Sequence, residues 1–169
     1  TLIAPAVFAL EGWLETRWRD AVDTGQLPPA KLMSRLEERL LWEQLVEQDL
    51  AQLYSFILLQ PSKAAQQAMR SRQLLMDFCC DYSTDGIAAS FRDDPDCAAF
   101  LRWLHAFDRR LRADALITSG DAQRALLSLT SNGSESVVLF HCLEVPPLAG
   151  RVLSHLALSV DHINPGVND

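Results

Sequence analysis

The residue with the clearest capacity for chemistry is Glu144, which follows an apolar run typical of a buried β-strand. The run Val137–Cys142 is followed by Leu143, Glu144 and Val145, and then by two prolines. Enzymes that hydrolyse ATP place a carboxylate at the end of a buried strand, where it faces Mg²⁺ and the attacking water. The alternative is a polar residue at the point where such a strand reaches solvent. Leu143 stands where a neighbouring aspartate is expected, so the sequence favours this alternative.

A stripe of positively charged side chains is the second candidate site, and its ligand would be DNA. Its members are Arg102, His105, Arg109 and Arg112. Their spacings of three and four residues place them on one face of a helix, which is able to follow a phosphate backbone. The alternative is a solvated helix face, with Asp108 and Asp114 nearby to neutralise it. The sequence favours the solvated face.

Several aromatic and basic residues are assigned to packing. The tryptophans are Trp13, Trp18, Trp42 and Trp103. Such rings can stack on the bases of a single strand, but three of them lie at or beside apolar helical stripes, so we expect them to be buried. Arg72 also lies on a stripe, and we expect it to extend from the core edge with its charged head in water. His141 and Cys142 are adjacent, so in a strand they point to opposite faces and do not pair.

The chain has none of the motifs that build a catalytic or metal centre. It has no glycine-rich phosphate loop, no GxSxG or HExxH motif and no paired cysteine or histidine ligands at metal-site spacing. Beyond the candidate Glu144 we therefore assign no catalytic residue. We also assign no metal site and no cofactor to this chain.

Composition and charge indicate a globular cytoplasmic protein. Of its 169 residues 49% are hydrophobic and 22% charged, which argues against disorder. The formal net charge of −7 means that any contact with nucleic acid is expected to be local. No apolar run approaches the roughly 18–20 residues of a membrane span, and the four cysteines without a CxxC pair indicate reduced thiols. The N-terminus has no initiating Met and no signal-peptide pattern, and we interpret it as a boundary within a longer chain.

The spacing of apolar residues predicts about six helices. They are expected over residues 7–23, from Ser34, from Pro61, from Pro95, after Gly120 and after Pro147. Ser34 and Glu37 fit a capping box, and Asp94 is expected to cap the helix that Pro95 opens. The helix from Ser34 is expected to continue through Leu53 and Ile57.

The strand candidates are few. Besides Val137–Cys142, only Thr1–Ile3 reads as extended, so strand neighbours within the chain are nearly absent. We expect one mostly helical domain over residues 1–160 and a polar tail over 161–169 that frays. Two strand pieces that flank a long helical region suggest a helical insertion within a larger α/β domain.

Four segments, taken in order, resemble the AddB-like proteins. These are bacterial DNA repair proteins of the helicase–nuclease type, in which helicase-like domains precede a C-terminal PD-(D/E)XK nuclease. The segments are Pro5–Leu14 (PAVFALEGWL), Leu40–Glu43 (LLWE), Phe100–Trp103 with Phe107 (FLRW and F), and Val137–Pro147. They are similar to the family's "TP…L..WL" helix after a strand exit, its "ALWE" helix, its "FLRW…F" helix, and its strand followed by "GFDEL.P". The resemblance spans most of the chain, although each motif is short and largely hydrophobic.

The resemblance implies the first helicase-like domain with its helical insertion, upstream of the nuclease. The implied fold is mainly α: a helical insertion or bundle of about six helices, with one or two short strands that belong to a partial RecA-like α/β domain. ATP and Mg²⁺ are implied for the parent family only. The family's "GFDE" corresponds here to His141–Glu144, where only the glutamate matches. Without that aspartate, the usual coordination of Mg²⁺ is not expected.

We therefore expect a non-catalytic helical segment of a helicase–nuclease DNA repair protein, with exonuclease activity elsewhere in the parent. It would scaffold that protein and contact single-stranded DNA beside the motor. Its expected partners are the remainder of the parent protein and single-stranded DNA, with no membrane. One alternative is a free-standing α-helical module that binds a partner protein, and another is an enzyme that uses Glu144.

Overall fold

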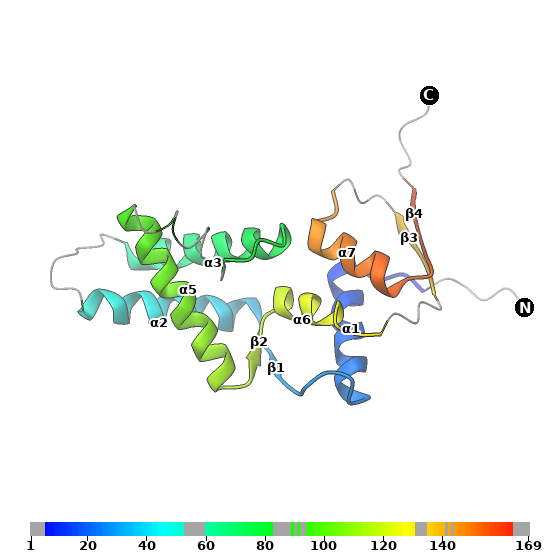
Figure 1. The fold of residues 1–169 in the computed structure, drawn as a ribbon, viewed down its shortest axis with the longest axis horizontal. Helices are drawn as coiled ribbons and strands as arrows, with labels where there is room; N and C mark the ends of the chain where they lie inside the picture. Colours follow the sequence, from blue (N-terminus) through cyan, green and yellow to red (C-terminus); the bar gives the residue numbers. More distant parts are fainter. Residues whose placement is uncertain are drawn as a thin grey trace, which may run out of the picture. The chain divides into compact units, whose positions relative to one another are not determined.

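The computed structural model describes residues 6–52, 60–82, 89, 91, 94–130, 135–140, 142 and 144–163. The helices in this part of the chain are α1 (Leu10–Asp23), α2 (Arg35–Gln52), α3 (Pro61–Asp77), α5 (Pro95–Ala113), α6 (Ser119–Leu126) and α7 (Pro147–Leu156). The strands are β1 (Lys31–Leu32), β2 (Leu116–Ile117), β3 (Ser136–Phe140) and β4 (Ser159–Ile163). The strands form two small sheets, β1–β2 and β3–β4 (Figure 1). The prediction of a mainly helical fold with short strands is confirmed.

The chain forms two compact units. Unit 1 takes its described residues from 1–29, 121–145 and 149–169, and unit 2 takes them from 30–120 and 146–148. Unit 1 holds α1, β3, β4 and most of α6 and α7. Unit 2 holds α2, α3, α5, β1 and β2. The single domain expected over residues 1–160 and the polar tail after it stay predictions.

Unit 2 is built on the packing of three helices, α2, α3 and α5 (Figure 1). Each carries apolar residues at helical spacing, and these stripes meet in one core. At its centre the Trp42 ring stacks on the Phe107 ring, with centroids 4.3 Å apart and an angle of 10° between planes. Ala65 and Ala68 of α3 are buried in the same core. Their small side chains allow the neighbouring helices to approach closely.

Arg72 of α3 is buried within unit 2, with only 3% of its surface exposed. Its Nη2 donates to Asp108 Oδ1 at 3.2 Å, and its Nη1 donates to Thr118 Oγ1 at 3.3 Å. The Tyr82 hydroxyl donates to the other Asp108 oxygen at 2.8 Å. The guanidinium carbon also lies 5.0 Å from the centroid of the Phe107 ring. The prediction that Arg72 holds its head in water is wrong, because Asp108 on α5 supplies a partly buried counter-charge that periodicity along α3 does not reveal.

The helix ends follow their local sequence signals. In α2 the Ser34 N–H donates to Glu37 Oε2 at 2.8 Å and the Glu37 N–H donates to Ser34 Oγ at 3.2 Å, so the predicted capping box is confirmed. In α5 the Asp94 side chain caps the helix by accepting from the N–H groups of Asp96 and Cys97, both at 2.9 Å. Pro61 and Pro95 open α3 and α5 as expected.

The end of α1 needs a left-handed residue. Gly25 has a φ of 72°, and its N–H donates to the Val22 carbonyl at 2.9 Å while the Gln26 N–H donates to the Ala21 carbonyl at 2.8 Å. This pair of bonds is the Schellman arrangement, which favours glycine because it has no Cβ. The turn directs the chain away from α1 at a fixed residue.

Unit 1 contains a β–α–β unit with a parallel strand pair, β3–α7–β4. The register pairs Ser136 with Ser159 and Phe140 with Ile163. The sequence predicted the first strand over residues 137–142, whereas β3 ends at Phe140. It did not predict β4, which includes residues 161–163 of the expected tail. A neighbour for β3 therefore does exist within the chain. The other extended candidate, Thr1–Ile3, and the proposed helix positions Leu53 and Ile57 lie outside the described residues.

The capping carboxylate of α2 predicts a loss of stability in acid. Hydrogen bonds, first from Lys31 and then from Ser34, lower the pKa of Glu37 from 4.5 to about 2. When folding lowers the pKa of a carboxylate, the ionised group stabilises the folded protein at any pH above its pKa in the unfolded chain. This stabilisation is lost as the pH falls to its pKa in the folded protein. Thermal unfolding followed by circular dichroism should show Glu37→Gln less stable than the parent at pH 7, with the difference vanishing between pH 4.5 and 2.

Glu47 supplies the control, because it is exposed on the same helix. Glu47→Gln should change the unfolding temperature little, both at pH 7 and in the acid range. If Glu37→Gln and Glu47→Gln behave alike, the capping network does not stabilise α2.

The ion pair between Arg72 and Asp108 predicts that removal of one partner destabilises the protein more than removal of both. Asp108→Ala leaves the Arg72 charge buried without its carboxylate, which should cost about 3–5 kcal/mol of unfolding free energy. The double variant Arg72→Met/Asp108→Leu should recover much of that loss, since it removes both charges. Urea denaturation measures the unfolding free energy of both variants.

The exposed pair Arg110–Asp114 is the matched control, and Arg110→Ala should cost below about 0.5 kcal/mol. Equal losses for Asp108→Ala and Arg110→Ala would contradict a structural role for the buried pair.

Candidate functional site

The positively charged stripe lies on the exposed side of α5 in unit 2. Arg102, His105, Arg109 and Arg112 are all exposed. They differ in their partners. Arg102 is held by Asp49 of α2, with Nη2 3.0 Å from Oδ2 and Nε 3.4 Å from Oδ1. Asp49 also accepts from Trp103 Nε1 at 2.7 Å, so it joins α2 to α5 through two side chains.

The two aspartates expected to neutralise the stripe are engaged elsewhere. Asp108 binds Arg72 and Tyr82 in the partly buried network described above. Asp114 pairs with Arg110, whose Nε lies 2.6 Å from Asp114 Oδ2. Within the part of the chain that the structure describes, no hydrogen bond or ion pair holds His105, Arg109 or Arg112. The expectation that Asp108 neutralises the stripe is wrong, because its carboxylate turns toward the core of unit 2.

The tryptophans lie mostly in the two cores. Trp18, Trp42 and Trp103 are buried, whereas Trp13, which the sequence also places on the apolar stripe of α1, is not fully buried. Trp13 is half-buried, and the guanidinium carbon of Arg17 lies 5.3 Å from the centroid of its ring. Three of the four rings are therefore not available to stack on bases.

Glu144 is exposed and lies between β3 and α7. It stands four residues beyond the last residue of β3, so it does not lie at the strand end. The neighbouring positions His141 and Leu143 lie outside the described residues. No group of three or more His, Cys, Asp or Glu side chains among the described residues could hold a metal ion. The geometry thus gives Glu144 no described partner for acid–base or metal chemistry.

All four cysteines are free thiols and half-buried. Burial, together with the negative charges of Asp94 and Asp96, raises the pKa of the Cys97 thiol. The thiolate is the reactive form, so this environment makes Cys97 a poor nucleophile. None of the described helices is long and apolar enough to cross a membrane.

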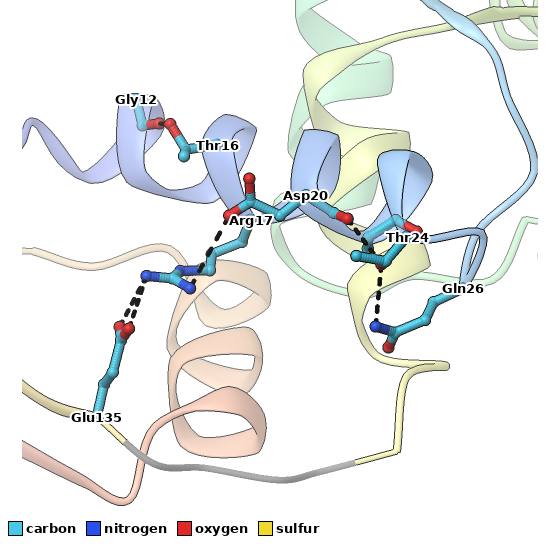
Figure 2. Close-up of polar contacts among 8 residues, drawn as sticks. Gly12, Thr16, Arg17, Asp20, Thr24, Gln26 and Glu135 are labelled. Carbon is cyan, nitrogen blue, oxygen red and sulfur yellow. Dashed lines mark hydrogen bonds and ion pairs between the residues drawn. The ribbon is translucent and has the colours of Figure 1, made fainter.

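A cavity that the sequence did not predict lies within unit 1, and its volume is about 250 Å³. Its polar lining consists of Arg17, Asp20, Thr24, Gln26, Thr130 and Glu135, and its apolar lining consists of Trp13, Ala21, Leu129 and Leu156. Figure 2 shows the Arg17 guanidinium between the carboxylates of Asp20 and Glu135. No motif marks this cavity in the sequence, because its walls come from α1 and from residues more than a hundred positions later.

The Arg17 side chain is held from two sides. Its Nη2 donates to both Glu135 oxygens, at 3.0 and 2.8 Å. Its Nη1 lies 4.0 Å from Asp20 Oδ2, and its Nε is buried without a hydrogen-bond partner among the described residues. Only part of its hydrogen-bonding capacity is used by the chain.

Comparisons with protein-family models, with curated proteins and with solved structures found no match for this chain. The similarity to AddB-like proteins therefore stays a hypothesis that rests on the four sequence segments alone.

Proposed function

We propose that this chain is a non-catalytic helical segment of a cytoplasmic, AddB-like helicase–nuclease DNA repair protein. It would scaffold the parent protein and contact single-stranded DNA through α5. The parallel β3–α7–β4 unit is the observation that carries this proposal. Unit 2 would be the helical insertion, and the β3–β4 sheet would belong to the partial RecA-like domain.

The β3–β4 sheet has only two strands, and they are parallel, which is unusual for so small a sheet. Parallel sheets occur almost only with both faces covered, and a two-stranded sheet is at best marginally stable. Here Leu139 is 6% exposed and faces the interior of unit 1. Phe140 is 65% exposed, and Ile163, its partner in the register, is 50% exposed. Val138, two residues before Phe140 and on the same face, is 52% exposed.

An apolar outer face of this kind is typical of a sheet with a further layer over it. In an α/β domain, additional strands extend a parallel sheet and helices cover both of its faces. The same face also suits the alternative, in which a free-standing helical module binds a partner protein. In the first case the rest of the parent chain buries Phe140, and in the second case a separate protein does.

The DNA contact is proposed for His105, Arg109 and Arg112. A phosphate backbone attracts cations that have no carboxylate already bound to them, and releases counterions when they bind. Arg102 contributes less, since Asp49 neutralises it at 3.0 Å. With a net charge of −7, such a contact is confined to this stripe and depends on low salt.

The DNA contact predicts salt-dependent binding that two arginines control. Fluorescence anisotropy of a labelled single-stranded oligonucleotide should show affinity that falls between about 50 and 200 mM salt. Arg109→Ala/Arg112→Ala should weaken binding and reduce the salt slope by about 1.4, since each phosphate contact on a single strand contributes about 0.7.

Arg35→Ala/Arg39→Ala is the matched control, because it removes two exposed arginines of α2 and changes the net charge equally. It should leave the salt slope near that of the parent. An equal slope for the α5 variant and the parent would exclude α5 as the contact. An absence of binding at low salt would leave only the scaffold role.

The exposed sheet face predicts a stability effect that depends on the length of the chain. In this chain Phe140→Ser should change the unfolding free energy by no more than about 0.5 kcal/mol, because the ring is already exposed. Leu139→Ala, the buried neighbour, should cost about 2–5 kcal/mol. In a chain extended to the rest of the proposed α/β domain, Phe140→Ser should cost about 3–5 kcal/mol, since the ring would then be buried. Urea denaturation of both lengths measures this. A small effect at both lengths would favour the free-standing module.

A further inference from the structure

The cavity in unit 1 places a cation and a carboxylate side by side as a loose ion pair, without a hydrogen bond between them. Arg17 Nη1 and Asp20 Oδ2 are 4.0 Å apart, which is too far for a hydrogen bond. Within the described residues Nη1 makes no other hydrogen bond, and it is not among the buried atoms that lack a partner. The Nη1 atom is therefore not fully buried. Asp20, with 59% of its side chain exposed, likewise presents its carboxylate to the cavity.

The Arg17 guanidinium is positioned before any ligand arrives. Glu135 binds its Nη2 with both oxygens, and the Trp13 ring lies beside it with the guanidinium carbon 5.3 Å from the centroid. The contact with the aromatic ring and the two hydrogen bonds to the carboxylate both restrict the Arg17 side chain. A ligand that binds Nη1 therefore loses little free energy in ordering this arginine.

Charge and size limit what the cavity accepts. One guanidinium faces two carboxylates, Asp20 and Glu135, so the lining is net negative and repels a phosphate group. A volume of about 250 Å³ lies below the range of about 300–1,000 Å³ that is usual for drug-sized ligands. Leu129 and Leu156 add an apolar wall. These properties fit a small molecule that has both a cationic donor and an anionic acceptor, close together, and an apolar side.

We propose that this cavity binds a small zwitterion of the α-amino acid type. The ligand carboxylate accepts from Arg17 Nη1, and the ligand ammonium donates to Asp20. Because one carbon atom separates the two groups in an α-amino acid, they match the adjacent cation and carboxylate shown in Figure 2. An aliphatic ligand side chain contacts Leu129 and Leu156. This binding is separate from the DNA contact proposed for α5.

The test is titration of the full chain with L-leucine, followed by two-dimensional ¹H–¹⁵N NMR. The Trp13 indole signal, assigned with Trp13→Phe, should shift with saturation and a Kd on the order of 1 mM. Asp20→Asn should weaken binding at least about tenfold, since it removes the charge that receives the ammonium. Asp23→Asn is the matched control: it lies on the same helix, is exposed and does not line the cavity. It should bind L-leucine as the parent does.

Three further probes separate the parts of the ligand. Propionate carries only the acceptor and butylamine only the cation, so each should bind at least about tenfold more weakly than L-leucine. Guanosine carries donors and acceptors without charge, and should not shift the Trp13 signal. The proposal is overturned if L-leucine causes no saturable shift, if Asp20→Asn binds it unchanged, or if guanosine binds in its place. Arg109→Ala/Arg112→Ala should keep L-leucine binding, so failure of the DNA contact and failure of this site give different results.

Discussion

The buried contact between Arg72 and Asp108 is the constraint on which unit 2 depends. An arginine inside an apolar core is costly unless a counter-charge and further hydrogen bonds accompany it. Here the counter-charge comes from α5, while Tyr82 and Thr118 satisfy further groups of the pair. The pair therefore fixes the position of α3 against α5 beside the stacked rings of Trp42 and Phe107. Apolar packing alone tolerates several helix registers, whereas a buried ion pair accepts few, so we infer that the pair selects the register of these helices.

The same constraint shapes the surface of α5. Three of the described carboxylates near this helix are each committed to a particular arginine: Asp49 to Arg102, Asp108 to Arg72 and Asp114 to Arg110. Within the described residues, these commitments leave His105, Arg109 and Arg112 as the members of the stripe without a carboxylate partner. An acidic chain can in this way present a local cationic face, because net charge does not describe how charges are paired. The scaffold and the proposed DNA contact are thus two consequences of one set of ion pairs.

Unit 1 differs from unit 2 in that its sheet exposes an apolar face. Its two parallel strands bury Leu139 on one face and expose Val138 and Phe140 on the other. A parallel pair of this kind is typical of a larger α/β sheet, and this is what links the fold to the proposed place of the chain in a helicase-like protein. The described residues that line the cavity beside α1 all belong to unit 1. A single unit thus combines a face suited to further protein with a site suited to a small ligand.

The sequence by itself determined the local elements. The spacing of apolar residues located all six described helices, and Ser34, Asp94 and the two opening prolines defined helix starts, because capping and proline effects act within one turn. It also identified β3, though not the two-residue strands β1 and β2, and it assigned most of the tryptophans to cores. Only the tertiary structure decided which charges meet. Arg72 lies 36 residues from Asp108 and Arg17 lies 118 residues from Glu135, and no periodicity encodes a contact over such separations. The strand β4 was missed for the same reason. Its residues, Ser159–Ile163, include two charged or titratable side chains and read as polar, so they form a strand only because they pair with β3.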